Sequence, residues 1–341
     1  MAAKQAVTMV HLWYSCRNDR HSVKTILETL FRPAILTAVL SILCLIGIAV
    51  VAMNHQTADS GAKPSAGIHQ PSMASVPVAT KDLTDKTGNT DAPALVPLGK
   101  QVAAYLSQHS PKSSVYLESL SKQNAVIVGD TGQHNTKSLM KLPLVMSLYK
   151  ADELGLLQLS KTIELTSDEI DRDYGDLWKK GAGHKLTLQE AAKLALQDSD
   201  NTAMNAINDH VNAAMPRSER AYNAMDLDMR VEHGDAFMTT EAYATVFRCL
   251  HASCYNDKQD SKQILELMEH TSFTAPNGLI PARTRITHKI GSVNTEGYND
   301  CGIVYGPKVP FIFCLMLTST QPQADMDIAQ IIKLGYDFFE K

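Results

Sequence analysis

The stretch NTKSLMKLPLVMSLYK, residues 135–150, contains two serines that each precede a lysine by three positions. Ser138 is paired in this way with Lys141, and Ser147 is paired with Lys150. Residues three apart lie on one face of a helix, so the lysine can take the proton of a serine nucleophile. This chemistry requires a lysine with a depressed pKa, because an ammonium group cannot act as a base.

The Ser-x-x-Lys pattern alone says little, because it occurs four times in the chain. Ser60 lies in a polar segment, and Ser119 ends an expected strand, where this spacing does not bring the pair together. Ser147 is deep inside its helix, where a serine is solvated or bonds to its own backbone. Ser138 lies in the first helical turn, where free N–H groups and the helix dipole favour developing negative charge. Its position at the start of a helix therefore favours Ser138 as the nucleophile.

The elements that must position these residues follow from the hydrophobic pattern. The runs SSVYLESL and NAVIVGD predict a hairpin, and a helix should run from the cap candidates Asn135 and Thr136 to about Leu154. Four more helices are expected in the middle of the chain, then three strands and a last helix. Strands at both ends with helices between them predict an α+β fold in which the ends share one antiparallel sheet and the middle forms a helical lobe.

Two further motifs fall at junctions of this pattern. Ser199-Asp200-Asn201 occurs once, between two expected helices, and by itself fits an ordinary helix N-cap. Lys-x-Gly occurs four times, and only the copy at 289–291, in THKIGSV, lies in an expected strand. Taken alone, it fits an edge-strand lysine beside a glycine bulge.

In this order, the three motifs resemble those of the penicillin-recognising serine enzymes, in particular the class A β-lactamases. The run IPARTRITHKIGSVNTEGYNDCGIVYGPKVPFIFCLML is also similar to the terminal strands of that family. The resemblance covers residues 98–341. It implies the β-lactamase/transpeptidase-like fold, with an antiparallel sheet flanked by helices plus a helical lobe.

The resemblance also implies catalytic roles for four residues. Ser138 would attack a carbonyl carbon and become acylated, and Lys141 would take its proton. Lys289, a second cation, would depress the pKa of Lys141 and attract a substrate carboxylate. Ser199 would relay a proton to the leaving nitrogen.

Three further residues would bind substrate: Asn201, Gly291 and Ser292. Asn201 would hydrogen-bond the amide of the substrate and steady the lysine base. The backbone N–H groups of Ser138 and Ser292 would form the oxyanion hole. The resemblance implies no metal and no cofactor, and neither zinc spacing nor a Gly-rich phosphate loop is present.

The chain departs from the family pattern at two places. Ile290 stands where the family has Thr or Ser, so a hydroxyl for the substrate carboxylate is missing unless Ser292 or Thr287 replaces it. The family also has a loop after Ser-Asp-Asn with a Glu-x-x-Leu-Asn pattern, whose glutamate activates the deacylating water. Here residues 227–239, LDMRVEHGDAFMT, are too short for that loop. Glu232 is the one candidate base, and an exposed loop residue is the alternative interpretation.

These observations predict an active-site-serine hydrolase that forms an acyl-enzyme with β-lactams or related peptides, with deacylation as the open step. Two alternatives remain. One is a D-Ala-D-Ala carboxypeptidase or penicillin-binding protein acting on cell-wall peptides, and the other is a non-catalytic binding module on the same fold. A formal net charge of −4 gives no indication of a nucleic-acid partner.

Residues 33–53, PAILTAVLSILCLIGIAVVAM, carry no charge and predict one transmembrane helix. Twenty-one residues at about 1.5 Å each reach about 31 Å, close to the thickness of a hydrocarbon core. The basic excess in residues 1–32 predicts a cytoplasmic N-terminus, a single pass through the cell membrane, and an extracytoplasmic catalytic domain. A cleaved signal peptide is the less favoured alternative.

Residues 54–97 are rich in small and polar residues and contain no Phe, Trp or Tyr, which predicts a disordered linker before a folded domain at 98–341. That domain contains four cysteines. Cys249 and Cys254 are close in sequence, and Cys301 would face Cys314 across a symmetric GPKV hairpin. Two disulfides are therefore predicted, with buried free thiols as the alternative.

Overall fold

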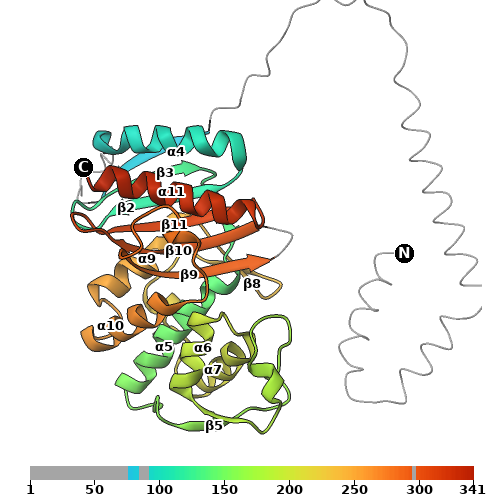
Figure 1. The fold of residues 1–341 in the computed structure, drawn as a ribbon. Helices are drawn as coiled ribbons and strands as arrows, with labels where there is room; N and C mark the ends of the chain where they lie inside the picture. Colours follow the sequence, from blue (N-terminus) through green and yellow to red (C-terminus); the bar gives the residue numbers. More distant parts are fainter. Residues whose placement is uncertain (1–75, 84–91, 294–296) are drawn as a thin grey trace, which may run out of the picture. The chain divides into compact units, whose positions relative to one another are not determined.

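The computed structural model describes residues 76–83, 92–293 and 297–341. A six-stranded antiparallel sheet forms the centre of the fold, with the strand order β1-β3-β2-β11-β10-β9 (Figure 1). Its strands are β1 (Val78–Asp82), β2 (Ser114–Ser119), β3 (Asn124–Gly129), β9 (Arg285–Val293), β10 (Gly297–Tyr305) and β11 (Phe311–Leu317). The predicted α+β class is confirmed, since strands from both ends of the domain share this sheet.

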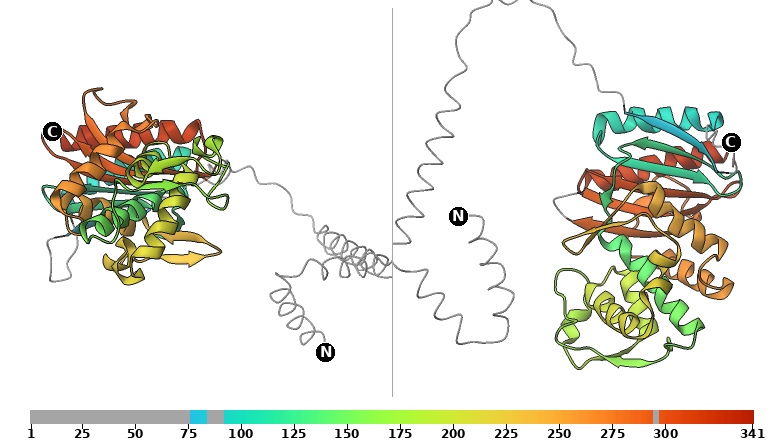
Figure 2. Two further views of the ribbon diagram at one scale, coloured as in Figure 1. Left: turned by 90° about the horizontal axis from the view of Figure 1, so that it is seen from below. Right: turned by 180° about the vertical axis from the view of Figure 1, so that it is seen from behind.

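The two faces of the sheet belong to two apolar cores. Val115 and Leu117 pack in the core beneath helices α4 (Val96–His109) and α11 (Gln323–Phe339), and Tyr116 packs in the other core. Helix α9 (Thr240–Ala252) and the helical lobe contribute to that second core (Figures 1 and 2). Successive side chains of a strand point to opposite faces, so these short apolar strands fill both layers.

The helical lobe carries two of the three motifs. A 3₁₀ turn, η2 (Lys137–Met140), leads directly into α5 (Lys141–Glu153), and α6 (Leu188–Gln197) is followed by α7 (Asn201–Ala214). Thr187 starts α6 with a capping box, because its hydroxyl accepts from the backbone of Glu190 and the Glu190 carboxylate accepts from the backbone of Thr187. The predicted order, strands at both ends with helices in the middle, is therefore present, except that the turn at Ser138 is 3₁₀ and not α.

The remaining elements are short, apart from one helix. They are η1 (Pro93–Leu95), β4 (His134–Asn135), β5 (Thr162–Glu164), η3 (Leu177–Lys180), β6 (Lys185–Thr187), η4 (Arg217–Glu219), α8 (Ala221–Ala224), β7 (Arg230–Glu232), β8 (Asp235–Met238), α10 (Lys258–Leu267), η5 (Met268–His270) and η6 (Ala275–Asn277). Strands β4, β8 and β7 form a small sheet next to η2.

The folded part begins earlier than predicted. Strand β1 lies inside the segment expected to be a disordered linker, and it pairs along its whole length with β3. Its polar sequence, VATKD, cannot form a stable strand alone, but the edge of β3 supplies a complete set of backbone partners. The composition of residues 54–97 could not reveal this pairing.

Both predicted disulfides are present: Cys249 is bonded to Cys254, and Cys301 is bonded to Cys314. Cys301 and Cys314 are direct cross-strand partners on β10 and β11, as the symmetric hairpin requires. The predicted transmembrane segment, 33–53, lies outside the described residues. Within the part that the structure describes, none of the helices has the length and apolar character needed to span a bilayer.

Candidate active site

The backbone around Ser138 is held by hydrogen bonds from distant elements. The hydroxyl of Tyr243 on α9 donates to the carbonyl of Leu139 at 2.6 Å, and the side-chain amide of Asn299 on β10 donates to the carbonyl of Asn135 at 2.8 Å. The buried sheet and α9 therefore fix the turn that presents the serine.

Gly291 packs directly behind this turn. A Cβ at position 291 would lie 2.5 Å from the carbonyl oxygen of Thr136 and 3.1 Å from the backbone nitrogen of Ser138. Only glycine allows β9 to approach the serine backbone so closely. Gly291 therefore contributes to the site by allowing β9 to pack closely against the turn that carries Ser138.

Lys141 is 1% exposed, and its Nζ is surrounded by four oxygen atoms. It lies 3.0 Å from Ser138 Oγ, 3.3 Å from Ser199 Oγ and 2.6 Å from Asn201 Oδ1, and it also donates to the backbone carbonyl of Ser199. A neutral amine has two N–H groups and one lone pair. The two carbonyl oxygens can only accept, so they take both N–H groups. The lone pair is left for a hydroxyl, and that of Ser138 is the nearer one.

Ser199 joins this group to Lys289. The Nζ of Lys289 donates to Ser199 Oγ at 2.8 Å and to the carbonyl of Ile290 at 2.9 Å. Ser199 itself has a backbone φ of +56°, a left-handed conformation that a non-glycine residue adopts at a cost of about 1–3 kcal/mol. This conformation holds the hydroxyl between the two ammonium groups.

Burial depresses the pKa of both lysines. Loss of hydration lowers the pKa of Lys141 to about 8, although the carboxylates of Asp200 and Asp171 act in the opposite direction. Burial, and then the charge of Lys141, hold the pKa of Lys289 well below its ordinary value. The charge of Lys141 thus lowers the pKa of Lys289, whereas the pKa of Lys141 is lowered by burial and not, as the family resemblance had implied, by Lys289. A neutral lysine next to Ser138 is therefore accessible near neutral pH.

Asp171 also belongs to this group of side chains, although the sequence patterns did not reveal it. Its Oδ1 accepts from the side-chain amide of Asn201 at 3.1 Å, while the Oδ1 of Asn201 faces Lys141. A carboxylate can only accept, so Asp171 fixes which end of the Asn201 amide faces the lysine. Asp171 lies on a loop thirty residues before Asn201, and only its place in the acidic run SDEIDRDYGD hinted at it.

Asp200, the middle residue of Ser-Asp-Asn, points away from the reacting groups. Its Oδ1 caps α7 by accepting from the backbone of Ala203 at 2.9 Å, and its Oδ2 accepts from the backbone of Leu177 at 2.8 Å. The helix N-cap expected from the pattern therefore coexists with the contacts that Ser199 and Asn201 make with Lys141.

Most of these groups line a cavity of about 780 Å³, but Lys289, which is 1% exposed, is not one of its lining residues. Ser138, Lys141, Ser199, Asn201 and Ser292 all border it. Its remaining wall mixes amide, apolar and basic side chains: Asn135, Asn205, Asn208, Met140, Leu144, Met204, Tyr222, Met229, Val231, Lys137 and Arg217, among others. A cavity of this size accepts a peptide-like or drug-sized ligand.

The candidates for the deacylation base and for a hydroxyl that binds the substrate carboxylate are Glu232, Thr287 and Ser292. Glu232 is on the exposed β7–β8 hairpin, is about half exposed, and pairs with Arg230; it is not among the residues that border the cavity. Thr287 is fully buried and donates to the carbonyl of Leu265, so its hydroxyl is not offered to substrate. Ile290 packs in the apolar core, and both Ile290 and Ser292 border the cavity.

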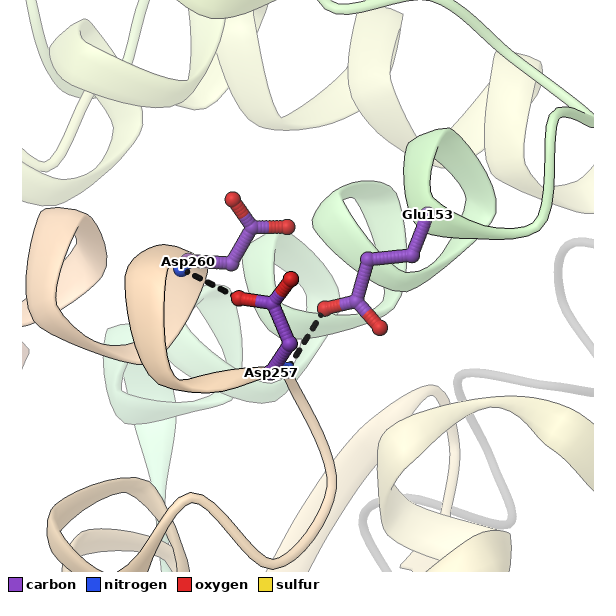
Figure 3. A group of neighbouring side chains, drawn as sticks. All are labelled: Glu153, Asp257 and Asp260. Carbon is purple, nitrogen blue, oxygen red and sulfur yellow. Dashed lines mark hydrogen bonds between the residues drawn. The ribbon is translucent and has the colours of Figure 1, made fainter.

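One group of acidic side chains in the described part of the chain is close enough to hold a metal: Glu153, Asp257 and Asp260 (Figure 3). It lies where α5 ends and α10 begins, at the opposite end of α5 from Lys141. Glu153 accepts from the backbone of Asp257 and Asp257 accepts from the backbone of Asp260, both at 2.8 Å. Burial and the neighbouring Glu153 raise the pKa of Asp260 to about 7. Helix capping thus explains the cluster without a metal.

Comparison with known proteins agrees with this geometry. The sequence model of the beta-lactamase enzyme family matches residues 97–339. The chain belongs to this family. The family assignment makes it a β-lactamase-like serine hydrolase, and residues 97–339 include all three motifs. No curated protein sequence matches the chain.

Solved structures share the fold at low sequence identity. An acyl-enzyme complex of a PBP-A mutant with penicillin G is 22% identical, with a TM-score of 0.66 over 72% of this chain and 97% of that one. A β-lactamase from Chitinophaga pinensis is 19% identical, with a TM-score of 0.65 over 71% and 98%. A mutant of the TLA-1 extended-spectrum β-lactamase is 18% identical, with a TM-score of 0.64 over 72% and 99%. The predicted family and fold are thus confirmed.

Proposed function

We propose that this protein is a serine acyl-transferring enzyme of the penicillin-binding type, which is acylated on Ser138 by β-lactams or related cell-wall peptides. The observation that carries the proposal is the environment of Lys141. Its Nζ lies 3.0 Å from Ser138 Oγ, both of its N–H directions are taken by carbonyl oxygens, and its pKa is lowered to about 8.

The proposed acylation uses four groups of the chain. Lys141 takes the proton of Ser138 as Oγ attacks the carbonyl carbon of the substrate, and the C–N bond then breaks. Ser199 gives its hydroxyl proton to the leaving nitrogen and recovers a proton from Lys141 or Lys289, both within 3.3 Å of its Oγ. The cation shared by the two lysines attracts the substrate carboxylate.

The same arrangement predicts slow deacylation. Hydrolysis of the ester needs a base beside the attacking water, and general-base catalysis contributes about 10²–10⁴-fold. Glu232 has its carboxylate on Arg230 outside the cavity wall. The carboxylates that border the cavity, Asp173 and Asp235, make no hydrogen bond with Ser138 or Lys141. We therefore favour a long-lived acyl-enzyme over an efficient β-lactamase.

Labelled penicillin and a chromogenic cephalosporin test this proposal together. We expect a stoichiometric adduct located on Ser138 by peptide mass spectrometry, and a burst of about one equivalent followed by slow turnover. Ser138→Ala should abolish the label, and Ser147→Ala is the matched control. Rapid turnover would identify a true β-lactamase, and the absence of any adduct would favour a non-catalytic binding module. A D-Ala-D-Ala peptide cleaved by the wild type but not by Ser138→Ala would identify the peptidase alternative.

The proposed location is the outer face of the cell membrane. Residues 33–53 form an uncharged run of 21 residues behind a basic segment, which supports a single-pass anchor with a cytoplasmic N-terminus. Protease added to intact spheroplasts should remove the catalytic domain and leave a membrane-bound fragment. Full protection of the domain, or a domain that is already free of the membrane before protease is added, would contradict this topology.

A further inference from the structure

A second cavity lies on the other side of the central sheet. It has a volume of about 700 Å³ and shares none of its lining residues with the cavity at Ser138. Strand β10, the segment before and within η6, and helix α11 form its wall. Figure 1 shows α11 running across this face of the sheet. Successive side chains of a strand point to opposite faces of the sheet. Tyr298 and Asp300 of β10 therefore lie on this side, and Asn299 and Cys301 lie on the side of Ser138.

A buried carboxylate with an unused oxygen borders this cavity. The side chain of Asp300 is 1% exposed, and its Oδ1 is bonded to Nδ1 of His288 at 2.8 Å. Its Oδ2 has no hydrogen-bond partner among the described residues. A buried polar atom without a hydrogen-bond partner is unfavourable, and more so when it is charged. Because His288 occupies Oδ1, Oδ2 is the atom left for a ligand.

His288 cannot satisfy the second oxygen. Its Nε2 lies 3.1 Å from the carbonyl of Phe273, so both of its ring nitrogens already face oxygen acceptors. Burial raises the pKa of Asp300, and the neighbouring Asp325 adds to this effect. His288 and Lys289 act in the opposite direction on this pKa, so what distinguishes Asp300 is the oxygen Oδ2 that has no hydrogen-bond partner among the described residues.

The rest of the wall matches an organic cation. Asp325 is a second carboxylate of the lining, and no Lys or Arg belongs to the lining within the described residues. The aromatic side chains of Phe273, Tyr298 and Tyr105 border the same space, and aromatic faces attract ammonium groups. Apolar side chains complete it: Ala275, Leu279, Met326 and Ala329. Leu279 and Met326 are about half exposed, so the cavity is reached from solvent.

We propose that this cavity binds a small organic cation, a protonated amine on a compact apolar body, with the ammonium group on Oδ2 of Asp300. The ammonium group donates to this unpaired oxygen, Asp325 adds long-range attraction, and the apolar body packs between Phe273 and Ala329. An anion of the same shape is repelled by both carboxylates. This site is separate from the acyl-transfer site and does not depend on the activity proposed for Ser138.

Fluorine NMR titration of the full chain tests the proposal with three probes of similar size: 4-fluorobenzylammonium, 4-fluorobenzyl alcohol and 4-fluorobenzoate. We expect saturable binding of the amine, binding of the alcohol weaker by about tenfold or more, and no binding of the carboxylate. Equal binding of amine and alcohol, or no saturable binding of the amine, would overturn the proposal.

Variants locate the site. Asp300→Asn should weaken binding of the amine by about tenfold or more. The matched control is Asp337→Asn on α11, whose carboxylate is half exposed and outside the cavity lining, and it should leave the affinity unchanged. If Asp300→Asn does not fold, Ala329→Phe fills the cavity and keeps Asp300 intact, and it should abolish binding while penicillin labelling of Ser138 continues. Unchanged affinity in Asp300→Asn or in Ala329→Phe would refute the assignment.

Discussion

Replacing Lys141 by arginine tests whether acylation depends on deprotonation of this side chain. At pH 7 a lysine of pKa about 8 is deprotonated in roughly one molecule in eleven, against roughly one in 3,000 at the ordinary value of 10.5. Burial thus increases the reactive fraction by about 300-fold. Arginine retains the positive charge and the length but does not deprotonate, so Lys141→Arg should lose acylation by at least about this factor.

The pH dependence of wild-type acylation gives a second measurement of the same quantity. The basic form of Lys141 is the active one, so the rate should rise about tenfold from pH 6 to pH 7, about fivefold from pH 7 to pH 8, and less than about twofold from pH 8 to pH 9. Stopped-flow burst rates with a chromogenic cephalosporin provide this profile. The control is Lys150→Arg, in the second Ser-x-x-Lys pair, where the lysine forms an ion pair with Glu153.

Asp171→Asn tests the direction of the electrostatic effect. The charge of Asp171 raises the pKa of Lys141, so its removal should move the midpoint of the acylation profile to lower pH. The asparagine keeps an acceptor for the Asn201 amide, whereas Asp171→Ala does not and should slow acylation at every pH. A flat profile between pH 6 and pH 8, or a Lys141→Arg variant that acylates normally, would refute Lys141 as the base.

Three further substitutions separate structural from catalytic roles. Ser147→Ala should lower the free energy of unfolding in urea by about 1–3 kcal/mol, because the backbone N–H of Ala221 loses its acceptor at 2.9 Å. Penicillin should still label Ser138 in this variant, and a lost label would contradict the structural role of Ser147. Gly291→Ala should slow acylation about tenfold or more, since its Cβ meets the carbonyl of Thr136 at 2.5 Å, and normal burst rates would disprove the close approach. Glu232→Gln should leave steady-state turnover of the cephalosporin within about twofold, and a large fall would show that the hairpin supplies the deacylating base after all.

Local sequence patterns were sufficient for the fold class and for most elements. Alternating apolar residues in SSVYLESL and NAVIVGD specify strands because the side-chain period of two must match the two buried faces. The capping box at Thr187 and Glu190 marks the start of α6 in the same local way. The spacing of Cys301 and Cys314 around a short turn was enough to predict their pairing, because register follows from turn length. The placement of Ser138 near the start of a helix was likewise local, although the turn is 3₁₀.

Tertiary structure decided which copies of the repeated motifs meet. Ser147 and Lys150 have the same spacing as Ser138 and Lys141, but only the latter pair lies where Ser199 and Lys289 converge. Position relative to the helix start favoured this pair, yet the depressed pKa of its lysine arises from burial among segments that are far apart in sequence. The sequence of one segment alone does not determine how strongly its lysine is buried when the chain folds.

Asp171, β1 and Asp300 show the same limit. The hydrogen bond from Asn201 to Asp171 spans thirty residues, and the partner strand of β1 lies more than forty residues away. The unpaired oxygen of Asp300 is visible only once His288 has been placed on the other one. Helices, turns and short strand pairs depend on neighbours in sequence. Burial, pKa values and the satisfaction of polar atoms depend on neighbours in space, which this chain brings together only when it folds.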